Sequence, residues 1–278
     1  MTTKISDLKT KGFVSVSYPQ ELREAVDATY VLWKKFCDLP IEVKQTLPYS
    51  NAGAGVGYEL KDGLGNKADR KENFDVSLGG VEWLRKNGKN FKDPVVLEFL
   101  HSVTSLVGIM KSLITDFAQS VEKEYRIEDF KKEVEQSESA FFVRFIHYFG
   151  NRNEGEEIAS PHADQSGFTL HLFESDPGLQ RLTLDTKGWI DMPVSEGETV
   201  IIPSMQLQLR SEGQLKALCH RVIATSETAK TGRYSAVCFV QLKNTSIYDK
   251  DRHGRLQEKE PGFNYDFSKD DFIKLFKN

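Results

Sequence analysis

The sequence lacks the features that define several large classes of protein. It has only three cysteines among 278 residues, and they are widely spaced with no Cys-x-x-Cys pair. We therefore expect neither a disulfide scaffold nor a thiolate zinc site, and we expect a reducing, cytoplasmic compartment. Any metal site must then be built from carboxylates and from the six histidines.

Excess positive charge and long apolar runs are also missing. The 37 lysines and arginines are outnumbered by 41 aspartates and glutamates, so the formal net charge is −4. A protein that coats nucleic acid needs clustered positive charge, so we expect no nucleic-acid partner. No apolar run approaches the roughly 18 residues of a membrane helix, and residues 1–8 have no apolar signal core. We therefore expect no membrane partner and no secretory signal.

Hydrophobic periodicity divides the chain into a helical part and a β-rich part. Apolar residues recur at helical spacing from Pro19 to about Leu39 and from Pro94 to Tyr125, which predicts two long helices. From Glu138 onward, short apolar runs alternate with turn signals, which is typical of a β-sandwich or barrel. The expected strands span 12–18, 141–149, 168–173, 179–184, 199–202, 220–224 and 234–242. The expected fold class is α+β in one compact unit.

One histidine stands out because a carboxylate follows it at a spacing of two. On a strand, His162 and Asp164 would project from the same face. An imidazole and a carboxylate that converge on one point make up two-thirds of a facial triad for non-heme Fe(II). The third ligand must be a histidine from another strand, and His220, which begins an apolar strand, is the natural candidate. For the triplet alone, the alternative is a surface histidine beside an aspartate.

A second polar pair lies thirteen residues after His220. Arg233 and Ser235 again share one face of a predicted strand. A guanidinium binds a carboxylate bidentately, and a hydroxyl can support it. Such a pair beside iron is what a dicarboxylate co-substrate such as 2-oxoglutarate needs. The alternative is that Arg233 is a surface charge after a glycine turn. That alternative does not explain why Arg233 and Ser235 share a face.

The order of the motifs resembles the isopenicillin-N-synthase-like branch of the Fe(II)/2-oxoglutarate-dependent dioxygenases. The resemblance covers about Leu8 to Leu242. The motifs that carry it are Lys11–Phe13, Phe36–Lys44, Gly57–Tyr58, Asp69–Phe74, Val143–Tyr148, Pro161–Asp164, Phe168–Leu170, Pro177–Gln180, Gln206–Gln208, His220–Val222 and Arg233–Ser235. It implies a single domain over 1–278. Within it, a mainly helical region, 1–137, would buttress a double-stranded β-helix (jelly-roll) catalytic core, 138–245, and an extension, 246–278, would follow.

The resemblance also implies roles for individual residues. The expected Fe(II) ligands are His162, Asp164 and His220. The residues expected to bind 2-oxoglutarate are Arg233, Ser235 and Tyr148. No catalytic residue is expected beyond the metal site. The candidate substrate residues are Arg144, His171, Gln206, Tyr58 and Phe74, and Arg144 would meet either a substrate carboxylate or an internal acid.

The activity that the resemblance implies is oxidation of an unactivated C–H bond of a small molecule. O₂ and 2-oxoglutarate would be the co-substrates, and succinate and CO₂ the co-products. Hydroxylation is the expected outcome. Desaturation or cyclisation is expected instead where the position of the substrate delays the transfer of oxygen to its carbon atom. By analogy, the substrate would be an amino acid or a specialised metabolite. Two alternatives stay open, namely an oxidase similar to isopenicillin N synthase or aminocyclopropane-carboxylate oxidase that does not use 2-oxoglutarate, and a non-catalytic jelly-roll binding module.

Overall fold

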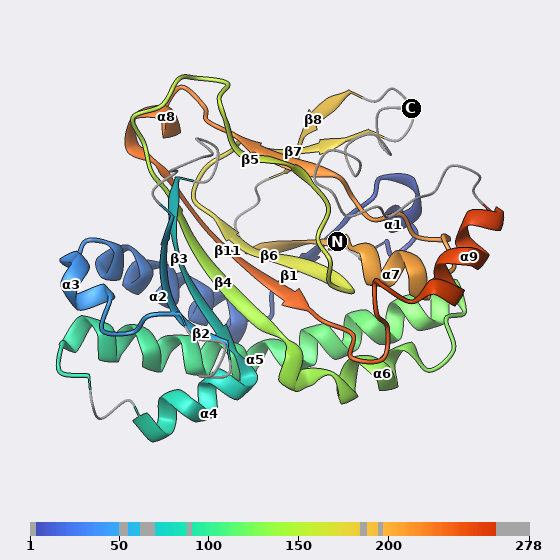
Figure 1. The fold of residues 1–278 in the computed structure, drawn as a ribbon, viewed down its shortest axis with the longest axis horizontal. Coiled ribbons are helices and arrows are strands. Elements are labelled where there is room, and N and C mark those ends of the chain that lie inside the picture. The colour runs from blue at the N-terminus through green and yellow to red at the C-terminus, as the bar shows by residue number, and fades with distance from the viewer. Residues whose placement is uncertain are drawn as a thin grey trace.

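The structure is a computed structural model that describes residues 4–49, 55–61, 70–87, 91–183, 188–193 and 197–259. In Figure 1, helices lie on one side of a large antiparallel sheet and a smaller sheet lies on its other side. The predicted α+β class is therefore confirmed. The predicted strand end at 184 and most of the predicted extension, 260–278, lie outside the described residues.

The two long helices form where periodicity predicts them. Helix α2 (Gln20–Cys37) follows Pro19, and helix α5 (Pro94–Tyr125) is capped by Asp93, whose side chain accepts hydrogen bonds from two backbone N–H groups of the first turn. The shorter helices are α1 (Asp7–Thr10), α3 (Ile41–Lys44), α4 (Leu78–Asn87), α6 (Phe130–Gln136), α7 (Met205–Arg210), α8 (Thr228–Thr231) and α9 (Lys250–Lys259), with one 3-10 turn (Glu138–Ala140).

The larger sheet has seven strands in the order β1-β9-β6-β11-β4-β3-β2, and every neighbouring pair is antiparallel. Its strands are β1 (Val14–Ser17), β2 (Val56–Lys61), β3 (Lys71–Ser77), β4 (Phe142–Tyr148), β6 (Phe168–Glu174), β9 (Glu198–Pro203) and β11 (Arg233–Val240). The three strands from the N-terminal half extend the sheet at its two edges. The C-terminal half supplies the four strands at its centre.

The smaller sheet has the order β5-β10-β7-β8. Its strands are β5 (Glu157–His162), β7 (Leu179–Leu182), β8 (Trp189–Asp191) and β10 (His220–Ile223). From β4 to β11 the chain passes back and forth between the sheets, which is the connectivity of a jelly roll. The predicted jelly-roll core, with helices packed on one sheet, is confirmed.

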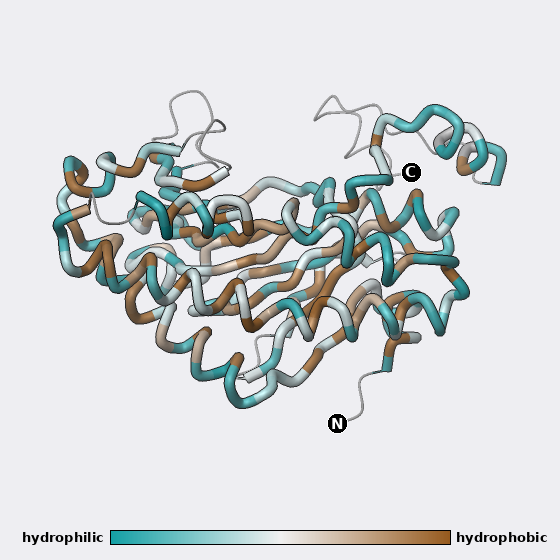
Figure 2. The backbone as a smooth tube through the Cα atoms, turned by 90° about the horizontal axis from the view of Figure 1, so that it is seen from below, coloured by the Kyte–Doolittle hydropathy of each residue, from teal (hydrophilic) through white to brown (hydrophobic). Residues whose placement is uncertain are grey.

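The main core lies between the larger sheet and helices α2 and α5. Phe99 of α5 is fully buried and packs on Trp33, Phe36 and Phe145, with ring centroids 5.0–5.5 Å apart. By length and composition α5 could cross a membrane, but thirteen of its residues are buried in this protein core. Figure 2 shows hydrophobic segments along the central strands and a mostly hydrophilic α9 at the edge. The apolar stripe of α5 is therefore a core-packing face.

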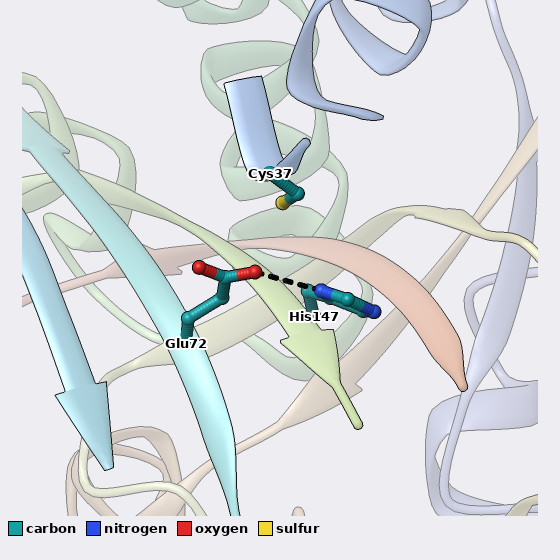
Figure 3. Close-up of side chains that lie close together, drawn as sticks. All are labelled: Cys37, Glu72 and His147. Carbon is teal, nitrogen blue, oxygen red and sulfur yellow. Dashed lines mark hydrogen bonds and ion pairs between the residues drawn. The ribbon is translucent and has the colours of Figure 1, made fainter. Parts of the chain in front are cut away.

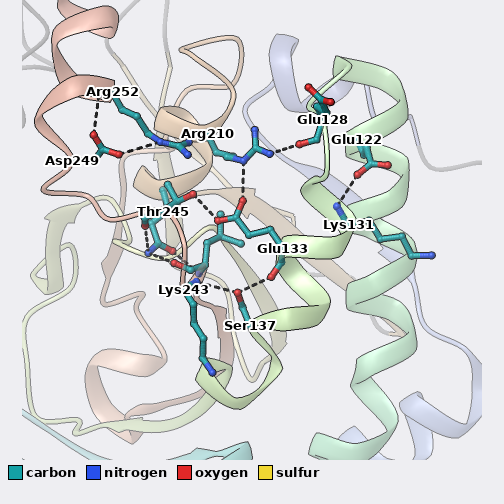
Figure 4. Close-up of polar contacts among 12 residues, drawn as sticks. Glu122, Glu128, Lys131, Glu133, Ser137, Arg210, Lys243, Thr245, Asp249 and Arg252 are labelled. Atoms are coloured by element: carbon teal, nitrogen blue, oxygen red, sulfur yellow. Dashed lines mark hydrogen bonds and ion pairs between the residues drawn. The ribbon is translucent and has the colours of Figure 1, made fainter.

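A buried polar network fixes α6 against α7 and the segment after β11 (Figure 4). Glu133 of α6 accepts hydrogen bonds from Nε of Arg210, at 2.8 Å, and from the hydroxyl of Thr245, at 2.7 Å. At the other end of α7, the backbone N–H of Met205 donates to the carbonyl of Asp164. The network therefore supports the loop that carries Asp164.

Candidate metal centre

An inner cavity of about 50 Å³ lies between the two sheets, and strands of both sheets line it. All six residues predicted to bind iron and the co-substrate line this cavity, namely Tyr148, His162, Asp164, His220, Arg233 and Ser235. Segments that are far apart in the sequence therefore meet at one place. Of the predicted substrate residues, His171 also lines it.

Strand pairing brings the three candidate iron ligands together. His162 ends β5, Asp164 follows two residues later, and His220 begins the neighbouring strand β10. The antiparallel register pairs His220 directly with His162, and their ring centroids are 4.3 Å apart. One potential ligand atom from each of the three residues lies within 4.8 Å of the other two. Two imidazoles and one carboxylate in this arrangement match a facial triad with open positions.

Hydrogen bonds orient the donor atoms of this triad. Nδ1 of His162 lies 2.8 Å from the carbonyl of Ser160, and Nδ1 of His220 lies 3.1 Å from the carbonyl of Leu218. Each Nδ1–H can donate to its carbonyl, which leaves Nε2 for a metal. The hydroxyl of Thr169 donates to Oδ2 of Asp164 at 2.6 Å. The residues present therefore fit an Fe(II) ion.

Burial and neighbouring charges keep Asp164 and His220 in the forms that bind a metal. Burial and the nearby His162 lower the pKa of His220 to about 4. Burial alone would raise the pKa of Asp164, but His220, His162 and the hydrogen bond from Thr169 outweigh it, and the pKa lies below its usual value. At neutral pH, His220 is therefore neutral and Asp164 is ionised, and these are the forms that bind a metal.

The predicted co-substrate residues share the cavity with an acid that the sequence analysis missed. Arg233 is 1% exposed and opens β11 opposite Tyr148. Its Nη2 is ion-paired with Oε2 of Glu174, and its Nε donates to the carbonyl of Asp176 at 3.2 Å. A buried arginine fits the distal carboxylate of 2-oxoglutarate. In this structure a carboxylate of the chain itself already pairs with it.

A β-bulge explains why Glu174 points into the cavity. Strand β11 pairs Val237 with His171 but Ala236 with Phe173, so Leu172 is the extra residue in β6. Residues three apart on a regular strand face opposite sides, but the extra residue returns Glu174 to the face of His171. Nδ1 of His171 then lies 2.8 Å from Oε1 of Glu174. The only local sign of this bulge in the sequence of β6 is the break in its apolar–polar alternation at Leu172 and Phe173.

Arg144 lies four residues before Tyr148 on β4, and therefore on the same face of that strand. It binds Asp75 of β3 through two hydrogen bonds, from Nε at 2.8 Å and from Nη2 at 2.7 Å. The side chain of Asp75 is 6% exposed. Of the two partners considered for Arg144, the structure shows the internal acid.

Four of the five candidate substrate residues, Arg144 among them, do not line the inner cavity. Phe74 is fully buried in the core between helices and sheet, with its ring centroid 5.2 Å from that of Phe99. Tyr58 pairs with Phe74 across β2 and β3 and donates its hydroxyl to Glu72 at 2.7 Å. The side chain of Gln206 hydrogen-bonds to the backbone of Leu242, through both its amide N–H and its carbonyl oxygen. These contacts are structural, and a role of Phe74, Tyr58 and Gln206 in substrate binding stays a prediction.

A second cluster, formed by Cys37, Glu72 and His147, also has atoms close enough to hold a metal (Figure 3). Both carboxylate oxygens of Glu72 already have partners: Oε1 lies 2.8 Å from Nδ1 of His147, and Oε2 accepts from Lys44 at 2.7 Å and from Tyr58. The lysine ammonium supplies the positive charge that a cation would bring. Burial raises the pKa of the Cys37 thiol, which keeps it protonated and unreactive. The cluster is therefore a structural network that joins α2 and α3 to β3 and β4.

A jelly roll with a His-Asp-His triad and a buried arginine in one cavity defines the class of non-heme iron oxygenases. Residues 137–242 match the family model of the 2OG-Fe(II) oxygenase superfamily. This part of the chain is thus similar to that superfamily, and the protein is an enzyme that uses Fe(II), 2-oxoglutarate and O₂. The superfamily that the motif order predicts is thereby confirmed.

Known proteins resemble the chain over most of its length. A protein of Didymella fabae named 2-oxoglutarate-dependent dioxygenase is 28% identical over 256 residues, which cover 82% of this chain and 75% of that protein. The structure of a full-length Neurospora crassa protein in complex with alpha-KG and thymine has a TM-score of 0.67 at 20% identity, covering 86% of this chain and 78% of that one. A rice dioxygenase for auxin oxidation has a TM-score of 0.68 at 18% identity, with 85% and 77% covered.

Proposed function

We propose that His162, Asp164 and His220 bind Fe(II), and that Arg233, Ser235 and Tyr148 hold 2-oxoglutarate. The enzyme would then hydroxylate an unactivated C–H bond of a small molecule and release succinate and CO₂. The observation that carries this proposal is that the triad and the buried arginine line one cavity. Bound iron and 2-oxoglutarate would together supply the activation of O₂.

The residues around the triad perform the supporting tasks. Thr169 and the backbone carbonyls beside the two histidines hold the ligand atoms in place. Ile146, Val222 and Val237 give the cavity apolar walls, which exclude water and strengthen the electrostatic contacts inside.

The comparisons support a small-molecule substrate. The Neurospora crassa structure contains thymine, and the rice structure is named for auxin oxidation. We propose a substrate of comparable size, an amino acid or a specialised metabolite. The three cysteines are buried and none is in a disulfide, which supports the proposed cytoplasmic location.

Co-product analysis tests the reaction type. The iron-loaded protein, incubated with a panel of small molecules and 2-oxoglutarate, is expected to release succinate with a substrate that gains one oxygen atom, both measured by mass spectrometry. O₂ consumption and substrate oxidation without succinate would instead favour the oxidase alternative. Absence of Fe(II) binding would favour a binding module.

Replacing Arg233 tests the proposed co-substrate site. Arg233→Lys keeps the charge but loses the two-pronged contact, so the KM for 2-oxoglutarate is expected to rise about tenfold or more, since a charge-assisted hydrogen bond contributes roughly 1.5–3 kcal/mol. Steady-state kinetics measure the effect. The matched control is Arg221→Lys, because Arg221 binds Glu157 and Gln180 outside the cavity. Equal KM values for the two variants would contradict the role of Arg233.

A further inference from the structure

We propose that Glu174 competes with 2-oxoglutarate for Arg233 and thereby sets the affinity of the enzyme for its co-substrate. The inference rests on the proposed function, in which Arg233 holds the distal carboxylate of 2-oxoglutarate. It concerns a residue outside the predicted motifs, and it makes the chain's own carboxylate a determinant of co-substrate binding.

Glu174 lies at the proposed binding site for the distal carboxylate of 2-oxoglutarate. Its carboxylate pairs with Nη2 of Arg233, and its backbone lies directly opposite Ser235 in the register of β6 and β11. The Arg233 and Glu174 side chains are 1% and 8% exposed. The carboxylate of Glu174 therefore contacts Arg233, and its backbone is paired with Ser235, the two residues proposed to bind the distal end of 2-oxoglutarate.

Charge makes the two carboxylates competitors. Burial alone would raise the pKa of Glu174, but Arg233 and His171 outweigh it, and the pKa lies below its usual value. Glu174 is thus ionised at neutral pH. Two carboxylates at one buried guanidinium repel each other, and the arginine can neutralise only one of them. 2-Oxoglutarate therefore binds only after Glu174 leaves Arg233.

The cavities supply the space for this movement. The inner cavity, at about 50 Å³, is far smaller than the roughly 300 Å³ at the lower end of small-molecule sites. Glu174 and His171 also line an outer cavity of about 380 Å³ beside α2. A rotation of Glu174 outward would open the inner cavity. Arg23 lines the outer cavity and offers a cation there, alongside the acids Asp27 and Glu198.

His171 acts as a positioning residue for Glu174. Its Nδ1 lies 2.8 Å from Oε1 of Glu174, which holds the carboxylate toward Arg233. Its Nε2 is buried and has no hydrogen-bond partner among the described residues. Among the described residues, the one hydrogen bond of the His171 ring is therefore the one that favours the paired state.

Calorimetric titration of the full chain tests the proposal without measuring turnover. The Mn(II)-loaded protein is titrated with 2-oxoglutarate, and the metal-free protein with glutarate, a dicarboxylate of the same length without the keto group. Glu174→Gln keeps the shape but removes the charge, so it is expected to bind both ligands at least tenfold more tightly than wild type. Equal or weaker binding of both would overturn the proposal.

Two further variants keep the result specific. Glu198→Gln removes an acid from the outer cavity without freeing Arg233, so unchanged affinity is expected, and tightening equal to that of Glu174→Gln would overturn the proposal. His171→Leu removes the contact that holds Glu174, so a smaller tightening of glutarate binding is expected. This variant also replaces Glu174→Gln if the latter does not fold, and unchanged glutarate affinity would then overturn the proposal.

Arg233→Met separates this proposal from the proposed function. If Arg233→Met weakens 2-oxoglutarate binding in the wild type and also cancels the gain in Glu174→Gln, both proposals are supported. If it weakens binding but Glu174→Gln gives no gain, the competition fails and the proposed function stands. If it leaves 2-oxoglutarate binding unchanged in both backgrounds, the assignment of Arg233 fails, and the competition fails with it.

Discussion

Asp164→Ala is expected to abolish stoichiometric Fe(II) binding and to lower 2-oxoglutarate turnover by more than about 100-fold. Loss of an outer hydrogen-bond partner of a metal ligand already costs about 10–100-fold in metal affinity, so loss of the ligand itself must cost more. Asp164 is also the only anion in the proposed triad. Its removal leaves His162 and His220, which are neutral ligands, to hold a divalent ion. Metal content after gel filtration and succinate release measure the two effects.

Two companion variants make this result interpretable. Thr169→Val removes the hydroxyl that donates to Asp164 at 2.6 Å, and an intermediate loss of iron affinity is expected. His101→Ala removes an exposed histidine on α5 and is expected to bind Fe(II) like the wild type. Wild-type iron binding by Asp164→Ala would contradict the assignment of the metal centre.

Lys44→Met is expected to lower the free energy of unfolding by about 3–5 kcal/mol, because breaking a buried ion pair from one side leaves an uncompensated charge. The Lys44 and Glu72 side chains are 9% and 2% exposed, and their atoms are 2.7 Å apart. Hydrogen bonds from His147, Lys44 and Tyr58 outweigh burial and hold the pKa of Glu72 below its usual value. Without Lys44, the ionised Glu72 would remain in the core. Urea unfolding measures the loss.

A matched variant and a double variant identify the cause. Lys35→Met removes an exposed lysine of α2, and its effect is expected to stay within about 0.5 kcal/mol. Lys44→Met combined with Glu72→Gln is expected to be less damaging than the sum of the single changes, because no buried charge is left alone. A loss for Lys44→Met no larger than that for Lys35→Met would show that the pair is not important for stability.

The long helices could be predicted almost to the residue, whereas several strands could not. Helix α5 has the predicted bounds because its apolar stripe and the Asp-Pro start are local signals. Strand β3 contains Glu72 and Asp75, and from the sequence alone such acidic residues are expected at the surface. In the structure both are buried, because Lys44 and Arg144 from other parts of the chain form ion pairs with them. The partners that make these acids compatible with burial come from tertiary structure alone. Strand β5 was missed for a local reason, since it contains a proline near its end.

The site was predictable where spacing alone decides which face a side chain occupies. Arg233 and Ser235 are a pair at a spacing of two on β11, and both line the inner cavity. Asp164 also lines the cavity, but it lies in the loop after β5, so strand alternation alone does not place it. Glu174 could not be found in this way, because the bulge at Leu172 reverses the alternation in β6. A bulge depends on the register with a partner strand. The sequence of β6 shows a break in alternation at Leu172 and Phe173, but it does not show how the strand pairs with β11.

Strand β6 constrains how this enzyme can diverge. One face of its seven residues carries Thr169, His171 and Glu174 toward the cavity, while Leu170 and Leu172 pack in the helical core. Moving the strand by one residue would exchange the two faces and lose the site and the core together. We therefore expect descendants with new substrates to keep β6 nearly unchanged. Substitutions that change the substrate should accumulate on the other strands that line the cavity. There a substitution does not have to fit both the cavity and the helical core.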